Sequence, residues 1–174
     1  IVETRYFNQR GYLSSISAGG TNRWTVNGMN AFQQVTSGTF GSSLNTTIGY
    51  DNFGYITSQT TGTIQNYSYN FNPATGNLNW RQNNKGSNLK EDFTYDNLDR
   101  LDDVKMGSIV TLDMAYDGNK GAITTKTDVG TMQYATSGKP YAVSTINPAT
   151  PTTPPNTQTI TYTSFDKIST ISED

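Results

Sequence analysis

The chain has 174 residues, of which 33% are hydrophobic and only 15% are charged, and its formal net charge is −2 at pH 7. The low charge excludes the disordered class of chains, and it argues against a nucleic-acid partner, which would require a basic surface. No apolar run approaches the ~20 residues of a membrane helix, so we expect no direct membrane insertion. Gly, Asn, Thr and Tyr take the place of aliphatic residues and favour short strands and turns.

Histidine and cysteine are both absent from the sequence. Imidazole is the commonest general base near neutral pH and the commonest metal ligand, and thiolates also serve as nucleophiles and zinc ligands. Ser-His-Asp catalysis, Cys-His catalysis and the usual zinc sites are therefore excluded within this chain. A pair of carboxylates from distant positions stays open as a catalytic arrangement, but the sequence marks no such pair. We expect no enzyme and no cofactor.

In chain order, strand-like stretches alternate with turns, and one pattern recurs about eight times with a period of about 22 residues. An anchor residue, usually tyrosine, precedes a turn residue, and an aliphatic residue two positions later opens the next strand. The anchors are Tyr6, Met29, Tyr50, Tyr69, Tyr95, Tyr116, Tyr134 and Tyr162. The turn residues are Gly11, Gln33, Gly54, Gly76, Asp99, Gly121, Gly138 and Asp166. Pro140 stands in the aliphatic position of the seventh repeat.

The strand signals differ on the two sides of each turn. Before the turn, aromatic and aliphatic residues such as Phe93 and Tyr95 alternate with polar residues, which is typical of a strand with one covered face. After the turn, Leu13 and Ile16 are three positions apart, which a regular strand would place on opposite faces. Either a β-bulge intervenes or both faces are partly covered.

A second set of turns separates the repeats and is marked by glycine, including Gly38 to Gly41 and Gly130. The longest connection, residues 147–156, contains four prolines, which bar regular strand pairing and predict a surface loop. No segment shows sustained helical periodicity. The sequence therefore predicts an all-β fold of consecutive antiparallel β-hairpins that form a curved, twisted repeat sheet or partial shell.

Three stretches resemble YD repeats, the repeat of the Rhs family, which also occurs in insecticidal toxin-complex proteins and teneurins. They are Tyr-Asp-Asn-Phe-Gly-Tyr-Ile at 50–56, Tyr-Asn-Phe-Asn-Pro-Ala-Thr-Gly-Asn-Leu at 69–78 and Tyr-Asp-Asn-Leu-Asp-Arg-Leu at 95–101. The resemblance covers nearly the whole chain. The departures are Met29 for tyrosine, Ala135 and Thr163 for aspartate, and Gln33 for glycine, and they suggest decayed repeats.

The resemblance implies hairpins joined into one long antiparallel sheet, which in full-length relatives spirals into a hollow shell around a toxin or other cargo. Residues 1–174 are expected to form a single YD-repeat β domain, a piece of a longer chain, because the sequence opens within a strand-like stretch without Met. The expected function is a non-catalytic structural scaffold of a secreted or cell-surface bacterial protein. The expected partners are neighbouring domains or repeats, with glycan or a toxin cargo as further possibilities.

Aspartate or asparagine follows several anchors, at Asp51, Asn70, Asp96 and Asp117. A ladder of carboxylates could bind calcium, but these residue types also open turns by accepting hydrogen bonds from nearby backbone N–H groups. The turn interpretation is favoured because a calcium site needs several oxygens that converge on one point. The acidic group around Asp99 is interpreted as a solvated surface.

Four aromatic residues occupy positions that are polar in the other repeats. One hypothesis makes them exposed platforms for sugar rings or for a protein partner, which would turn the domain into a binding module. The other makes them cross-strand cover, which stabilises a sheet by about 0.2–1 kcal/mol per pair. The candidate contact residues are Tyr12, Tyr55, Trp80 and Tyr141.

Overall fold

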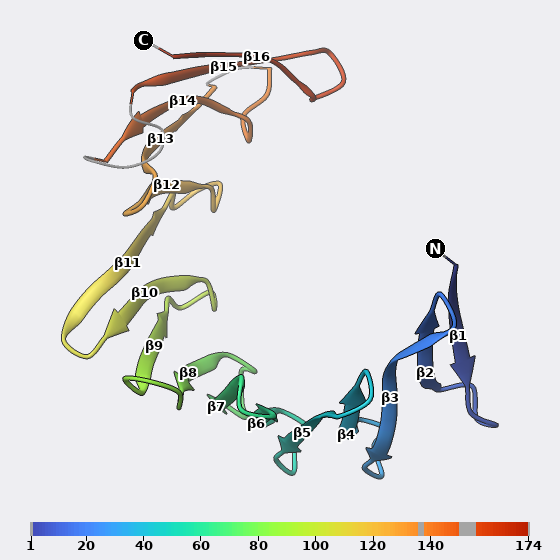
Figure 1. Ribbon diagram of the computed structural model, residues 1–174. Coiled ribbons are helices and arrows are strands. Elements are labelled where there is room, and N and C mark those ends of the chain that lie inside the picture. Colours follow the sequence, from blue (N-terminus) through green and yellow to red (C-terminus); the bar gives the residue numbers. More distant parts are fainter. Residues whose placement is uncertain (1, 136–137, 150–155, 174) are drawn as a thin grey trace. The chain divides into compact units, whose positions relative to one another are not determined.

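The computed structural model describes residues 2–135, 138–149 and 156–173, and these residues form sixteen β-strands without a helix. No helix in this part of the chain could therefore cross a membrane. Figure 1 shows the strands following one another as hairpins. The first eight are β1 (Glu3–Phe7), β2 (Leu13–Ala18), β3 (Thr21–Met29), β4 (Val35–Phe40), β5 (Leu44–Tyr50), β6 (Ile56–Thr61), β7 (Gln65–Phe71) and β8 (Leu78–Asn83). The others are β9 (Leu89–Tyr95), β10 (Leu101–Met106), β11 (Ile109–Tyr116), β12 (Ile123–Lys126), β13 (Gly130–Tyr134), β14 (Val143–Pro148), β15 (Gln158–Tyr162) and β16 (Ile168–Glu173).

The strands stand in the sheet in their sequence order, β1 to β16, and neighbouring strands are antiparallel wherever their register is described. This order confirms the predicted all-β sheet of consecutive hairpins. The chain divides into two compact units, residues 1–92 and residues 93–174. Each repeat is one hairpin, with an odd-numbered strand, a turn and an even-numbered strand.

The turn residues explain why the hairpins form where they do. All eight of them have a positive φ, between 57° at Asp99 and 86° at Gly54. Glycine reaches this region freely, whereas other residues enter it at a cost, aspartate and asparagine most readily among them. Gln33, Asp99 and Asp166 keep the left-handed conformation without glycine, so the repeats that depart from the sequence pattern still form hairpins.

Bulges account for the aliphatic residues that lie three positions apart. In the first hairpin Tyr6 pairs with Ser15 and Phe7 pairs with Leu13, so Ser14 has no partner in the register. Six other hairpins have the same shift directly after the aliphatic residue. An extra residue in one strand returns Leu13 and Ile16 to the same face of the sheet. The first of the two alternatives left open by the sequence is therefore correct.

The register corrects two predicted anchors. Phe7, and not Tyr6, pairs with the aliphatic Leu13, and Phe71, and not Tyr69, pairs with Leu78. In both repeats the alignment on tyrosine chose a neighbouring aromatic residue. Asn72, one position after Phe71, consequently takes the turn-opening role that had been assigned to Asn70.

Other corrections concern the seventh repeat and the connections. Tyr134 pairs with Val143, and not Pro140, so this turn is longer than predicted. Pro148 ends β14 opposite Gly130 instead of lying in a loop, while the other three prolines of the predicted loop fall outside the described residues. Gly38 lies within β4, where a Cβ atom would come within 2.0 Å of the Trp24 ring.

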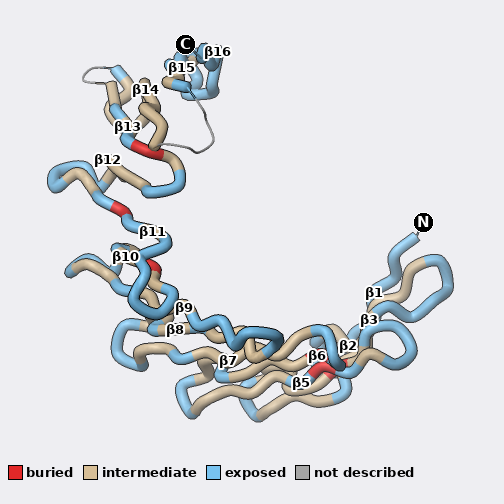
Figure 2. The backbone as a smooth tube through the Cα atoms, turned by 60° about the vertical axis from the view of Figure 1, so that its left-hand side comes forward, coloured by how far each residue is buried: buried red, intermediate tan, exposed pale blue. Residues whose placement is uncertain are grey.

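The described residues form one layer without a closed core. The buried hydrophobic side chains are Val104, 6% exposed, and Met114, 8% exposed. Thr46 and Thr61 are also buried, and their hydroxyls lie 2.8 Å apart across β5 and β6. Figure 2 shows short buried segments within a tube that is otherwise half-buried or exposed. Stability must therefore come largely from contacts between adjacent repeats.

We predict that Gly121→Ala destabilises the second unit by about 1–2 kcal/mol, because alanine is strained at the φ of +70° that this turn requires. Gly118→Ala is the matched control in the same turn, since Gly118 lies outside the left-handed region and a Cβ atom there would meet nothing within 4 Å. Urea unfolding followed by circular dichroism measures both variants. Equal losses of stability would contradict the role of the left-handed turn.

Candidate functional site

The turn-opening carboxylates and amides accept hydrogen bonds from the backbone of their own turns. Asp51 Oδ1 accepts hydrogen bonds from the backbone N–H groups of Phe53 and Tyr55, both at 2.9 Å. Asp96 Oδ1 does the same for Leu98 and Arg100. The same arrangement occurs at Asn8 and Asn30. Asn72 Oδ1 accepts from the Ala74 N–H, and Asp117 Oδ1 accepts from the N–H groups of Asn119 and Lys120. This geometry agrees with the turn interpretation of the sequence.

These hydrogen bonds also set the charge state of the carboxylates. The Arg100 side chain donates to Asp96 and holds the pKa of that carboxyl below its usual value. Backbone N–H groups of Lys120 and Asn119 lower the pKa of Asp117. Within the residues that the structure describes, no three acidic side chains come together as ligands for a metal ion.

Anchor tyrosines join several of the repeats to the repeat before them. The Tyr50 hydroxyl donates to the Val35 carbonyl at 3.0 Å, and the Tyr116 hydroxyl donates to the Leu101 carbonyl at 2.7 Å. The acceptor is in each case the aliphatic residue that opens the second strand of the preceding hairpin. Two further bonds of this kind run from Tyr134 to Ile123, 2.8 Å, and from Tyr162 to Val143, 3.0 Å.

A bulge stands beside these acceptor carbonyls. Val35, Ile123 and Val143 each directly precede the residue that the register skips. A bulge disrupts the ladder of backbone hydrogen bonds at that point. The tyrosine hydroxyl of the next repeat supplies a hydrogen-bond donor there. The bulge therefore both shifts the register and leaves a carbonyl that contacts the next repeat. We call these bonds the anchor clasps.

A second series of contacts joins successive turns through the residue that follows each turn residue. Gln34 Nε2 donates to the Gly54 carbonyl at 2.8 Å, in the turn of the next repeat. The Arg100 guanidinium lies 4.2 Å from the centre of the Tyr116 ring. Lys139 forms an ion pair with Asp166 in the following turn. The sequence alone showed that this position is usually polar, but it did not predict which residues of the next repeat it would contact.

Tyr55 and Trp80 are both half-buried and take part in contacts within the chain. The Tyr55 ring stacks on Phe71 at 5.3 Å between centroids, and its hydroxyl lies against Gly76 in the next turn. The Lys90 ammonium lies 5.3 Å from the centre of the Trp80 ring. These two candidates therefore have the surroundings of cross-strand cover.

Tyr12 and Tyr141 are more open, with 40% and 71% of their surface exposed. Tyr141 lies in the long turn between β13 and β14 and borders a recess of about 490 Å³. Lys139, Tyr162 and Asp166 also line this recess. The structure does not gather the four aromatic candidates at one site.

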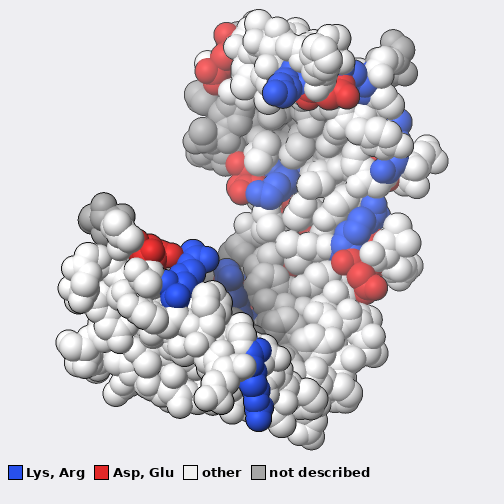
Figure 3. Space-filling model, turned by 90° about the vertical axis from the view of Figure 1, so that its right-hand side faces the viewer, with Lys and Arg blue, Asp and Glu red and all other residues white. Residues whose placement is uncertain are grey.

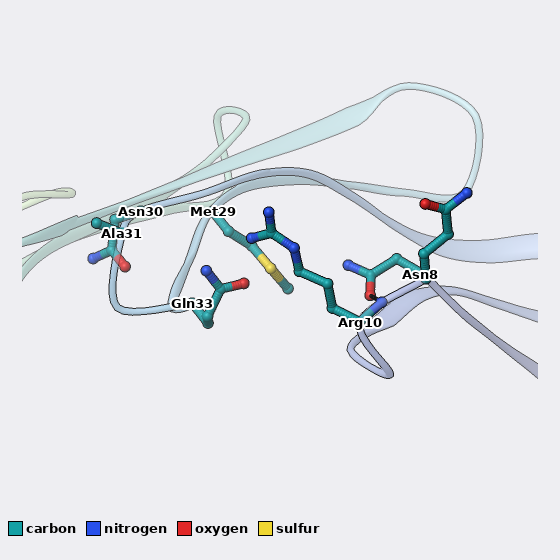
Figure 4. A pocket seen from close by; sticks show the side chains of 7 residues that line it. Asn8, Arg10, Met29, Asn30, Ala31 and Gln33 are labelled. Atoms are coloured by element: carbon teal, nitrogen blue, oxygen red, sulfur yellow. Dashed lines mark hydrogen bonds between the residues drawn. The ribbon is translucent and has the colours of Figure 1, made fainter.

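An open groove of about 650 Å³ separates the first turn from the second. Figure 4 shows Arg10 reaching from the first turn toward Met29 and Gln33 of the next repeat. The backbone N–H of Arg10 donates to Asn8 Oδ1 at 2.9 Å, so the turn itself is fixed. The groove is polar and shallow, and its walls carry no carboxylate.

Charged side chains occur in small mixed groups on an otherwise uncharged surface, as Figure 3 shows for one face. Several of them form ion pairs between residues two positions apart, exposed for Arg5 with Glu3 and half-buried for Lys105 with Asp103. Exposed pairs contribute about 0–1 kcal/mol each. On the face drawn in Figure 3, the described residues therefore provide no extended surface of one sign that would attract a polyelectrolyte.

No protein-family model matches the sequence, and no curated protein matches it as a relative. Solved structures do resemble its fold. The chain aligns over 95% of its length with a chain in the crystal structure of TcdB2-TccC3-Cdc42, with a TM-score of 0.63 and 13% identity, and covers 12% of that chain. The structure of TcdB2-TccC3-TEV gives a TM-score of 0.63 at 12% identity, and that of TcdB2-TccC3 gives 0.59 at 10% identity, each with 95% of this chain and 10% of the other covered. The chain thus has the fold of about a tenth of these much longer chains.

We predict that Tyr134→Phe destabilises the second unit by about 1 kcal/mol, because it removes one anchor clasp. Burial, and then the nearby Tyr162, raise the pKa of Tyr134 above its usual value of 10.0. The folded chain therefore keeps the hydroxyl proton of Tyr134 at pH values at which the unfolded chain loses it. The stabilisation from this hydroxyl is complete below pH 10 and is lost as the pH rises further.

Urea unfolding between about pH 8 and pH 11 measures both effects, since this range spans the usual tyrosine pKa. At the lower end of this pH range, the free energy of unfolding of Tyr134→Phe should be lower than that of the unmodified chain. It should also decline less steeply at high pH. Tyr141→Phe, at an exposed position, is the control and should change neither the stability nor its slope with pH. Identical behaviour of the two variants would argue against the clasp.

Proposed function

We propose that the chain is a structural segment, a stretch of β-sheet wall that acts through its continuous backbone rather than through a catalytic site. The observation that carries this proposal is the series of anchor clasps, which ties four of the hairpins to the preceding hairpin at an equivalent place. A stack of hairpins joined in this way makes an extended surface whose length grows with the number of repeats.

The likeness to the TcdB2-TccC3 structures supports this proposal at the level of the fold. We extend it to membership of the Rhs family, to a secreted or cell-surface bacterial location, and to a wall that encloses a toxin or other cargo. The turn geometry at Asp51 and Asp96 supports the family assignment, because it gives each residue of the repeated motif a role. Further repeats that extend the same sheet are the expected neighbours.

A binding module for carbohydrate is the second candidate, and the recess beside Tyr141 is the observation that favours it. An exposed aromatic ring can stack on the apolar face of a sugar ring, while charged groups accept or donate hydrogen bonds to its hydroxyls. Lys139 and Asp166 stand at the same recess and could serve in this way. Tyr55 and Trp80 favour this candidate less, because each already contacts a neighbour within the chain.

Titration of the 174-residue chain against a panel of glycans separates the two functions. The structural proposal predicts no saturable binding, and it predicts that Tyr141→Ala leaves the fold and stability unchanged, because this side chain is 71% exposed. Saturable binding that is lost in Tyr141→Ala but kept in Tyr12→Ala would overturn the structural proposal in favour of the binding module.

A further inference from the structure

The groove between the first and second turns is open where later turns are joined by side chains. Gln34 Nε2 bridges the second and third turns by donating to the Gly54 carbonyl at 2.8 Å. The Tyr55 hydroxyl lies against Gly76 in the fourth turn. Tyr12 holds the equivalent position in the first repeat and is 40% exposed, and the groove of about 650 Å³ lies between its turn and the next.

Among the described residues that line the groove, Arg10 carries the charge. Arg10 forms no ion pair with a described carboxylate. Residues 4–50 contain three arginines and no lysine, aspartate or glutamate, and Arg5 pairs with Glu3. A guanidinium offers N–H donors in a planar fork that fits a carboxylate, so the groove has a group ready to hold one.

Gln33 brings a second polar side chain to the groove, from a backbone position that suits glycine. Its φ is +63°, and glycine holds this position in five of the eight turns. Glutamine enters the left-handed region at a cost that glycine avoids. The Gln33 side chain lines the groove and makes no hydrogen bond to a described residue. Its amide therefore remains available to a ligand, and backbone strain of this kind is often found at binding sites.

The two turns also have the composition of a protein-binding surface. Arginine, methionine and aromatic residues are enriched at protein interfaces, whereas lysine, aspartate and glutamate are depleted. Arg10 and Met29 line the groove. The rings of Tyr12 and Phe32, which belong to the turns on its two sides, are exposed. The amide of Gln33 has the same donor and acceptor set as a peptide group, so it can pair with the backbone of a partner.

We infer that this groove binds an acidic segment of a protein partner, with an aspartate or glutamate carboxylate on Arg10 and the partner's backbone on the Gln33 amide. Figure 4 shows Arg10 extending from the first turn toward Gln33 of the second. Met29 contributes a flexible apolar side chain that adapts to the residues of the segment. The inference concerns only the first two hairpins, and it holds whether or not the chain forms part of a wall.

Titration of the 174-residue chain into a fluorescein-labelled hexaglutamate peptide tests the inference, with fluorescence anisotropy as the readout. We expect saturable binding that weakens as salt is added, and no binding of hexaglutamine with the same label. Arg10→Gln should weaken hexaglutamate binding at least about tenfold, as expected for the loss of a hydrogen bond between charged groups.

Arg23→Gln is the matched control, because Arg23 is also an exposed arginine without an ion pair to a described carboxylate. The two substitutions change the net charge equally, and Arg23→Gln should change the affinity by no more than about twofold. Equal losses in the two arginine variants, or no saturable binding of hexaglutamate, would overturn the inference.

Gln33→Gly separates binding from folding. Glycine suits the left-handed turn, so the midpoint of urea unfolding should be at least as high as that of the unmodified chain. Hexaglutamate binding should nevertheless weaken about two- to tenfold, because the amide is lost. Unchanged binding in Gln33→Gly would contradict the proposed contact with the partner's backbone. Binding of an oligogalacturonate with the same number of carboxylates, at an affinity equal to that of hexaglutamate, would overturn the assignment to a peptide in favour of an acidic sugar.

Discussion

The hydrogen bond from an anchor tyrosine to the carbonyl of the preceding repeat is the interaction on which the rest of the structure depends. A single layer with so few buried side chains cannot be held by a closed hydrophobic core. The clasps of Tyr50, Tyr116, Tyr134 and Tyr162 instead secure four of the hairpins to their predecessors. Each bond contributes about 1 kcal/mol, so stability accumulates with the number of repeats.

The clasp depends on two irregularities, the left-handed turn residue of all eight repeats and the bulge of seven of them. The left-handed turn residue brings the second strand back, and the bulge after the aliphatic residue disturbs the ladder beside the acceptor carbonyl. Without the bulge, Leu13 and Ile16 would face opposite sides of the sheet.

The turns were predictable from the sequence because turn chemistry is local. Gly54 and Asp99 predict a left-handed backbone conformation, and an Asp or Asn ahead of them predicts the hydrogen bonds that open the turn. The anchors of the first and fourth repeats were predicted wrongly because two aromatic residues lie close together there, and only the register separates them. The length of the turn in the seventh repeat was predicted wrongly because Pro140 lies two positions after the turn residue, where the other repeats have their aliphatic residue. In the structure Val143 pairs with the anchor instead.

The contacts between repeats could not be predicted from the sequence, because they join residues about one repeat apart and the types of these residues vary. Gln34 and Arg100 occupy equivalent positions, yet one meets a carbonyl and the other an aromatic ring. Strand pairing also brings Phe71 against Tyr55 and Lys90 against Trp80, whereas Tyr141 lies at a recess.

Native-state hydrogen exchange on Tyr50→Phe tests the central claim most directly, because this substitution removes only the hydroxyl that reaches Val35. We predict that protection of the amides shared by β4 and β5 falls about two- to tenfold, as expected for the loss of about 1 kcal/mol, while the hairpin of β7 and β8 keeps its protection. Unchanged protection at β4 and β5, or an equal loss throughout the first unit, would contradict the claim that the clasps hold the repeats together.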